Sequence, residues 1–159
     1  MSYYKKICCF AGHGKYDLNN DKIEQLYELC QNLILNEYVS EFWVGNYGLF
    51  DKTVAKVIRD IKNKYTGVEL CLVIPYLTKV INNYKENFYN DYDDIIIADI
   101  PKSTPKRYHI IKCNQYMVDN SDFLISYVNY NGGGAARTLN YALRQKHIKI
   151  YNIGQLKVD

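Results

Sequence analysis

The sequence predicts an α/β protein with a Rossmann-like, three-layer fold around a mostly parallel sheet of about six strands. Short apolar runs of strand length alternate along the chain with segments whose apolar residues recur every three or four positions. One run, Val68–Ile74, is apolar almost throughout, as expected of a strand buried on both faces of a parallel sheet. The 159 residues contain no repeat or linker, so we expect residues 1–159 to form a single domain.

Each predicted strand is a short apolar run bounded by turn residues or proline. Besides Val68–Ile74, the predicted strands are Lys6–Ala11, Glu41–Val44, Asp94–Ala98, Phe123–Val128 and His147–Asn152. Their alternation with helical segments is by itself the reason to expect a parallel sheet.

The predicted helices carry their apolar residues on one face. Helical spacing is found over Ile23–Ile34, Val54–Ile61, Tyr108–Asn120 and Ala135–Leu143. Asp51 is expected to cap the second of these helices. The stretch Tyr76–Tyr92 is less regular, and we expect a short helix through Val80–Tyr84 followed by a loop.

Composition and charge exclude several classes of protein. The net charge is only +3, with acidic and basic residues interleaved, so we expect neither a nucleic acid nor a membrane as a partner. No apolar stretch reaches transmembrane length, and the first apolar run is too short for a secretory signal. The five cysteines lie on apolar faces or in apolar runs, without a C-x-x-C pair. We therefore predict core thiols in a reducing cytoplasm, with no metal site and no cofactor.

Glycine-bearing turns follow three of the predicted strands. These turns are Gly12–Gly14, Gly45–Gly48 and Asn131–Gly134, and Pro75-Tyr76 follows a further strand. Glycine lets backbone N–H groups approach a ligand, and the helix that starts after the last turn adds unpaired donors and the positive end of its dipole. Open parallel sheets bind ligands at the C-terminal ends of their strands. We therefore predict a site for a phosphate-bearing ligand there, the alternative being tight turns that bind nothing.

Two common nucleotide-binding motifs are absent from the sequence. Asp17 stands where a G-x-G-x-x-G motif begun at Gly12 would need its third glycine, and no lysine–serine pair of a P-loop is present. Ordinary NAD-type binding and P-loop chemistry are therefore not expected.

Two polar side chains are placed to face the predicted site. His13 lies between two glycines, where it can donate to a phosphate or titrate near neutral pH, the alternative being a solvent-exposed turn histidine. Asn114 shares a helical face with Ile110 and Met117, so its amide should point inward and need partners. The glycine turns or a ligand can supply those partners, and a purely structural role is the alternative.

Two arginines and two tyrosines complete the predicted site. Arg107 and Arg137 stand near helix starts, where a guanidinium suits phosphate oxygens or is simply a solvated charge. Arg137 opposes the helix dipole, which favours an anion nearby, and the neighbouring threonine can offer its hydroxyl to the same group. Tyr47 and Tyr76 can stack on a base. The full predicted ligand-binding set is Gly12, His13, Gly14, Gly45, Asn46, Tyr47, Gly48, Tyr76, Arg107, Asn114, Asn131, Gly132, Gly133, Gly134, Arg137 and Thr138.

Three segments of the chain match the pattern of a known family. They are C-C-F-A-G-H-G near the start, F-W-V-G-N-Y-G-L-F-D at the second turn, and N-Q-Y-M-V-D-N-S-D followed by N-G-G-G-A-A-R-T-L-N-Y-A. In these segments the sequence resembles the SLOG superfamily, and more narrowly its YpsA-like branch of small proteins from Firmicutes and their phages. The resemblance covers nearly the whole chain. It implies a Rossmann-like fold that binds nucleotides or nucleotide-derived signals, and a homo-oligomer with the site near the interface.

Some SLOG relatives, the LOG-type phosphoribohydrolases, cleave the base from a nucleoside monophosphate. These enzymes resemble the chain around Met117 and have an arginine four positions before that methionine, where this sequence has Cys113. They also have a glutamate after the glycine loop, whereas this sequence has no acid in Gly132–Gln145. Because N-glycosidic cleavage passes through a cationic sugar that a carboxylate stabilises, both losses argue against this chemistry. A relocated carboxylate, Asp17, Asp51 or Asp99, could restore it, but the sequence selects none of them.

We therefore predict a protein that senses or sequesters a phosphorylated, nucleotide-derived small molecule, with no catalytic residue assigned. An ADP-ribose-type immune signal, held by a phage-encoded sponge, is the specific form of this hypothesis. The alternatives are a LOG-type N-glycosidase acting on nucleoside 5′-monophosphates and an interaction protein whose site is vestigial. The expected compartment is the cytoplasm, and the resemblance implies a homo-oligomer.

Overall fold

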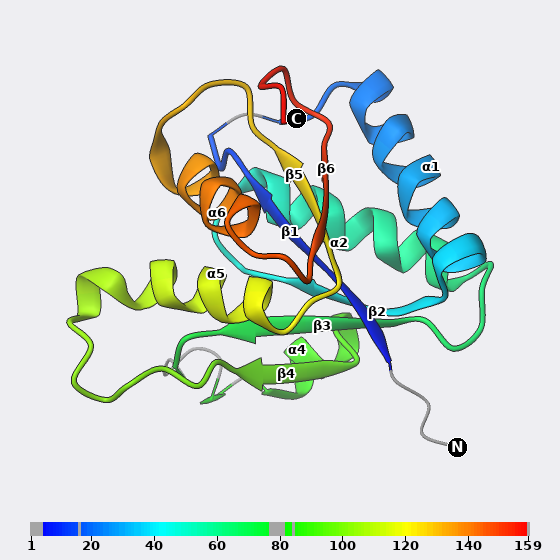
Figure 1. Cartoon of the computed structure of the whole chain (residues 1–159). Coiled ribbons are helices and arrows are strands. Elements are labelled where there is room, and N and C mark those ends of the chain that lie inside the picture. The colour runs from blue at the N-terminus through cyan, green and yellow to red at the C-terminus, as the bar shows by residue number, and fades with distance from the viewer. Residues whose placement is uncertain (1–4, 16, 77–81, 84, 159) are drawn as a thin grey trace.

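A six-stranded sheet, parallel throughout, forms the middle layer of the protein (Figure 1). The computed structural model describes residues 5–15, 17–76, 82–83 and 85–158. The strands are β1 (Lys6–Gly12), β2 (Val39–Val44), β3 (Glu69–Ile74), β4 (Asp94–Ile97), β5 (Phe123–Tyr127) and β6 (Lys149–Asn152). The helices are α1 (Asn20–Glu37), α2 (Leu49–Lys62), α4 (Lys85–Asp91), α5 (His109–Asp119) and α6 (Gly133–Leu143), with a 3₁₀ turn η1 (Lys106–Tyr108) before α5.

The order of strands across the sheet is β4-β3-β2-β1-β5-β6. The chain first moves outward from β1 to β4 and then returns to place β5 on the other side of β1. The order therefore reverses between β1 and β5, and the crevice at the C-terminal ends of these two strands is where such sheets bind ligands. The predicted α/β fold with a parallel sheet of about six strands is confirmed.

Two apolar layers hold the helices to the sheet. Alternate residues of β1 point to opposite faces, so Cys8 and Phe10 belong to one layer and Cys9 and Ala11 to the other. Helices α1 and α2 cover the first layer, and α5 and α6 cover the second (Figure 1). The central strands are buried on both faces, as predicted for Val68–Ile74.

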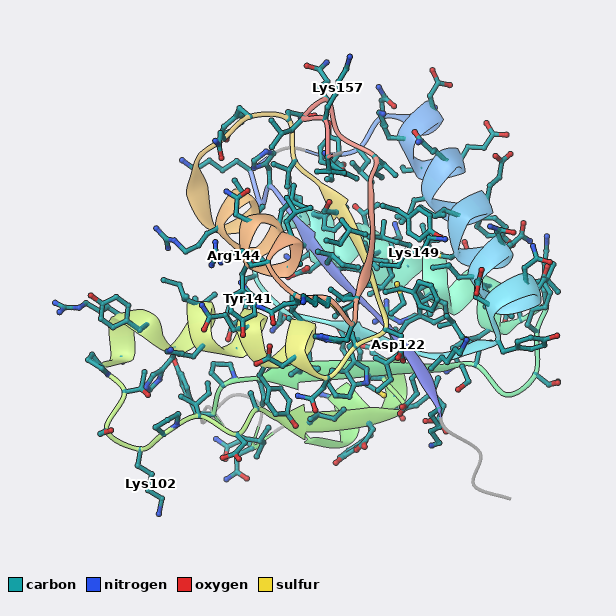
Figure 2. The ribbon with its side chains drawn as sticks, viewed as in Figure 1. Lys102, Asp122, Tyr141, Arg144, Lys149 and Lys157 are labelled. Atoms are coloured by element: carbon teal, nitrogen blue, oxygen red, sulfur yellow. The ribbon has the colours of Figure 1, made fainter. Side chains whose placement is uncertain are left out.

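The structure tests the predictions made for the cysteines and for membrane-spanning segments. All five cysteines are buried and free, as the sequence predicted. No helix within the described ranges is long and apolar enough to cross a membrane. Charged side chains project outward from many parts of the chain, and Lys102 and Lys157 point away in opposite directions (Figure 2).

The segment between β3 and β4 differs from the prediction. The prediction of a loop leading to Tyr92 is wrong, because Lys85–Asp91 forms the helix α4. Its sequence, KENFYND, is only seven residues long and too short to show a helical period. The short helix predicted at Val80–Tyr84 lies outside the described residues except for positions 82 and 83, which are helical.

The predicted cap of α2 is also different in the structure. The helix begins at Leu49, with Gly48 at the N-cap and no side-chain cap. Asp51 therefore lies in the first turn, not before it, and its Oδ2 accepts the backbone N–H of Tyr47 at 3.0 Å. The acid still satisfies a backbone donor beside the helix start, but from inside the helix.

Gly12 owes its identity to packing rather than to a ligand. A Cβ placed there would lie 2.3 Å from Cγ of Phe50, a fully buried ring. Gly12→Ala should therefore lower the free energy of unfolding by roughly 1–3 kcal/mol, as expected for overpacking a core. Urea denaturation measures this, with Gly134→Ala as the control because a Cβ there meets no atom within 4 Å. An unchanged unfolding midpoint for Gly12→Ala would contradict this packing.

Candidate functional site

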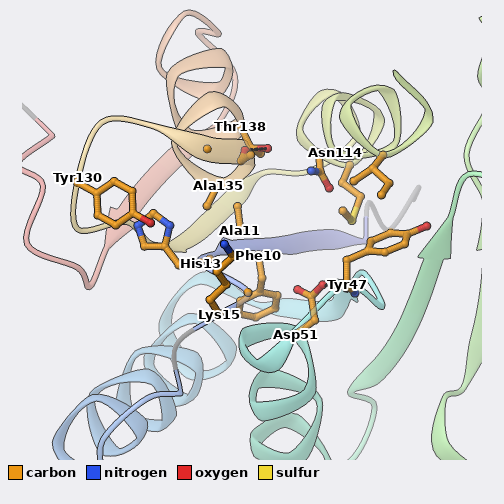
Figure 3. Close-up of a pocket in the computed structure, with 16 residues that line it drawn as sticks. Phe10, Ala11, His13, Lys15, Tyr47, Asp51, Asn114, Tyr130, Ala135 and Thr138 are labelled. Carbon is orange, nitrogen blue, oxygen red and sulfur yellow. Dashed lines mark hydrogen bonds between the residues drawn. The ribbon is translucent and has the colours of Figure 1, made fainter. Parts of the chain in front are cut away.

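A cavity of about 330 Å³ lies at the C-terminal end of β1, beside the first turns of α2 and α6 and one side of α5 (Figure 3). Its position is the crevice that the strand order predicts. The cavity is lined by Phe10, Ala11, Gly12, His13, Gly14, Lys15, Tyr47, Asp51, Ile110, Asn114, Met117, Tyr130, Gly133, Gly134, Ala135 and Thr138.

The structure brings together only part of the predicted ligand-binding set. The predicted residues that line the cavity are Gly12, His13, Gly14, Tyr47, Asn114, Gly133, Gly134 and Thr138. The predicted residues outside the lining are Gly45, Asn46, Gly48, Tyr76, Arg107, Asn131, Gly132 and Arg137. Both arginines are exposed, and the guanidinium of Arg107 lies 4.9 Å from the centre of the Tyr108 ring. A ligand contact by any member of this outer set stays a prediction.

His13 is buried at the end of β1 rather than exposed in a turn. Its ring stacks on Tyr130, with ring centroids 4.3 Å apart, and its Nε2 lies 3.0 Å from the backbone nitrogen of Asn129. Because a backbone N–H can only donate, Nε2 must be an unprotonated acceptor, which places the proton of the neutral ring on Nδ1. Burial lowers the pKa of His13, in agreement with a neutral ring. His13 can therefore offer one N–H donor but no positive charge.

The first two glycine turns pack directly on each other. Gly48 has a φ of +120°, and a Cβ there would lie 2.6 Å from Cα of Gly14. The backbone N–H of Leu49 donates to the Gly14 carbonyl at 3.0 Å. Glycine is thus required at Gly48 both by its backbone angle and by this close approach. The contact sets the start of α2 beside the end of β1, which brings Asp51 to the cavity.

Asp51 is the carboxylate among the lining residues. One oxygen, Oδ2, accepts the Tyr47 N–H, and no hydrogen bond joins Oδ1 to the described residues. Burial raises the pKa of the Asp51 carboxyl from 3.8 to about 6, although the Tyr47 N–H opposes this shift by favouring the ionised form. At neutral pH the cavity therefore contains a poorly solvated negative charge. Of the three acids that the sequence left open, Asp51 lines the cavity and Asp17 and Asp99 do not.

The start of α6 supplies the opposite electrostatic character. Its first turn holds no acid, and its N-cap, Gly132, makes no side-chain cap. Gly133 has a φ of +82°, and a Cβ at Gly133 or Gly134 would meet no atom within 4 Å. These two glycines differ from Gly12 and Gly48, because no neighbouring protein atom crowds them, although the positive φ of Gly133 itself favours glycine. An 11-residue helix directs its first N–H groups and its positive dipole end toward an open space.

The α5 wall carries Asn114 between Ile110 and Met117, all three lining the cavity. The predicted inward orientation of Asn114 is thus correct (Figure 3). Its amide is half-buried and forms no hydrogen bond to the described part of the chain, so it is available to a ligand. On α6, Thr138 donates its hydroxyl hydrogen to the Gly134 carbonyl at 3.0 Å.

Sequence reasoning missed several lining residues. Phe10 and Ala11 precede the first glycine turn, and Lys15 follows it, so their closeness to Gly12–Gly14 was a usable signal. Tyr130 directly precedes the last glycine turn, and this position was a weaker signal because 17 tyrosines are spread along the chain. Its role as the partner of His13 depends on the contact of two segments more than 100 residues apart.

One cluster away from the cavity combines acids and a thiol. The ligand atoms of Glu41, Glu69 and Cys71 lie within 4.8 Å of one another. Their closeness follows from the sheet, since Glu41 and Glu69 are register partners on β2 and β3. This group was not predicted from the sequence, and it lacks a fourth ligand among the described residues.

Comparison with known proteins finds similar folds among solved structures. No family model matches the chain, and no curated protein matches it in sequence. DNA processing protein A (DprA) from Streptococcus pneumoniae is similar in structure, with a TM-score of 0.62 at 13% identity. The match covers 94% of this chain and 50% of the DprA chain, so the protein spans half the length of DprA.

The molybdenum cofactor (Moco) carrier protein from Chlamydomonas reinhardtii is a second neighbour. One of its structures has a TM-score of 0.55 at 18% identity, covering 96% of this chain and 77% of that one. Another has a TM-score of 0.51 at 18% identity, covering 89% and 72% of the two chains. At these identities the likeness is one of fold alone, and membership of the SLOG superfamily and of its YpsA-like branch stays a prediction.

Proposed function

We propose that the protein binds a phosphorylated, nucleotide-derived small molecule in the cavity at the end of β1. The observation that carries this proposal is the start of α6, where Gly133 and Gly134 face open space and no acid occupies the first turn. A phosphate there would accept backbone N–H groups and meet the positive end of the helix dipole. Lys15, on the same cavity wall as His13, adds a positive charge.

The size of the cavity supports a compact ligand. Its volume of about 330 Å³ is near the lower end of the range of roughly 300–1,000 Å³ typical of small-molecule sites. A cavity of this size can enclose a nucleoside monophosphate, and a larger molecule would extend over its rim. The Moco carrier protein, by its name, carries a small molecule on the same fold, which is consistent with this kind of use.

The narrower form of the proposal is that the ligand is an ADP-ribose-type immune signal and the protein a phage-encoded sponge for it. This form rests on the SLOG resemblance alone. An ADP-ribose would place one phosphoribosyl group in the cavity, and the other would extend over its rim. Oligomerisation near the site is part of the same proposal.

The test is to denature the purified protein and identify the released small molecule by mass spectrometry. We expect an intact nucleotide derivative in stoichiometric amount, or, for a protein purified empty, an increase in melting temperature on adding AMP or ADP-ribose. No released nucleotide, together with no thermal shift from either compound, would contradict the proposal. That outcome would favour the interaction-protein alternative.

A second candidate function, N-glycosidic cleavage of a nucleoside 5′-monophosphate, is favoured by the position of Asp51. The structure places this carboxylate in the cavity, where it could stabilise a cationic sugar in the way that the missing glutamate would have done. Incubating the protein with AMP and measuring free adenine by chromatography separates the two functions. Adenine that accumulates over many turnovers in the parent protein, but not in Asp51→Asn, would establish the enzyme.

A further inference from the structure

The two ends of the cavity differ in charge, and this difference defines how a ligand can lie. One end is the start of α6, which favours an anion, and the other is Asp51, which holds a negative charge at neutral pH. A phosphate beside Asp51 would be repelled, because like charges in a partly desolvated site cost several kcal/mol. The cavity therefore suits a ligand with an anionic end and an end rich in hydrogen-bond donors.

Asp51 is held in place to accept hydrogen bonds from that second end. The Tyr47 N–H at 3.0 Å fixes Oδ2, and the absence of a side chain at Gly45 leaves space, since a Cβ there would lie 3.0 Å from Oδ2. Oδ1 has no partner among the described residues, and a carboxylate oxygen can accept two hydrogen bonds. Asp51 is thus a fixed acceptor with spare capacity in the cavity.

We propose that Asp51 accepts hydrogen bonds from the vicinal hydroxyl groups of a ribose whose 5′-phosphate lies at the start of α6. The inference rests on the proposed nucleotide binding and deepens it, because it defines the sugar as ribose rather than deoxyribose. Two adjacent hydroxyl groups are neutral donors that can reach both oxygens of one carboxylate. Asn114 faces the cavity from α5, and its amide, which has no hydrogen bond to the described residues, can accept from or donate to the same sugar (Figure 3).

The experiment compares the affinities of AMP, 2′-deoxy-AMP and inorganic pyrophosphate by calorimetry. The proteins are the parent, Asp51→Asn, and the control Asp60→Asn, an exposed acid on the same helix. We expect the parent and the control to bind AMP at least tenfold more tightly than 2′-deoxy-AMP, since a hydrogen bond to a charged group is lost. In Asp51→Asn the ratio should fall to about threefold or less, while pyrophosphate binds as well as before or better.

The outcomes separate this inference from the function on which it rests. If AMP and 2′-deoxy-AMP bind the parent equally, or if Asp51→Asn keeps the full preference, the role of Asp51 is wrong but the phosphate site stands. If neither the nucleotides nor pyrophosphate bind, both proposals fail. Asparagine can still accept the Tyr47 N–H, so the ratio of two affinities within one variant does not depend on a change in folding.

Discussion

Placing a carboxylate at Gly134 should abolish phosphate binding without harming the fold. In Gly134→Asp the new side chain enters open space, where a Cβ meets no atom within 4 Å. An acid in the first turn of α6 suits the helix dipole, so we expect the melting temperature to stay level or increase. The same charge would occupy the position proposed for the phosphate, and like-charge contact costs several kcal/mol. Affinity for AMP should therefore fall at least a hundredfold.

Gly134→Ala is the matched control for this prediction. It adds a methyl group at the same position without a charge, and alanine in a helix is more favourable than glycine by about 1 kcal/mol. We expect higher stability than in the parent and a much smaller loss of affinity than in Gly134→Asp. Calorimetric titration with AMP and thermal unfolding measure both quantities. Unchanged AMP affinity in Gly134→Asp would place the phosphate elsewhere.

Asp51→Asn should stabilise the ligand-free protein at neutral pH. In the parent protein, the pKa of the Asp51 carboxyl is 3.8 in the unfolded chain and about 6 in the folded protein, so folding disfavours the ionised form. Below pH 3.8 the carboxyl is protonated in both states and costs nothing. Between pH 3.8 and 6 the cost grows as pH rises, and above pH 6 it is constant at roughly 3 kcal/mol.

The measurement is the free energy of unfolding in urea at pH 4 and at pH 7.5. We expect Asp51→Asn to exceed the parent by about 2–3 kcal/mol at pH 7.5 and by much less at pH 4. Asp60→Asn, an exposed change on the same helix, should stay within about 0.5 kcal/mol of the parent at both pH values. Destabilisation of Asp51→Asn at pH 7.5 would show that the carboxylate is part of the structural framework. A higher free energy of unfolding in Asp51→Asn, as expected, would instead show that Asp51 lowers the stability of the folded protein, as functional residues often do.

The repeating pattern of strands and helices could be predicted because it depends on local chemistry. Val68–Ile74 lies in a parallel sheet that is covered on both faces, and its residues are continuously apolar because both faces of the strand are buried. The glycine turns at the strand ends are equally local signals. The helix α4 was missed because seven residues, KENFYND, contain too few apolar positions to reveal a period.

The glycines show the limit of reading function from residue type. Gly12, Gly48 and Gly133 look alike in the sequence, yet only the fold tells which neighbour each one faces. Gly12 accommodates Phe50 and Gly48 accommodates Gly14, whereas Gly133 faces no protein atom within 4 Å. The positive φ of Gly133 favours glycine by itself, and the space beside this residue is left open to a ligand.

The sequence by itself determined the α/β class, the parallel sheet and the edge of the sheet where the cavity lies, because periodicity and turn residues act over short stretches of chain. The tertiary structure alone decided which side chains share the cavity. It brought Asp51 and Asn114 to the cavity, left Arg107 and Arg137 outside its lining, and buried His13 beneath Tyr130. These placements depend on how β1, α2, α5 and α6 meet in space, and contacts between segments so distant in the chain leave no periodic mark in a single sequence.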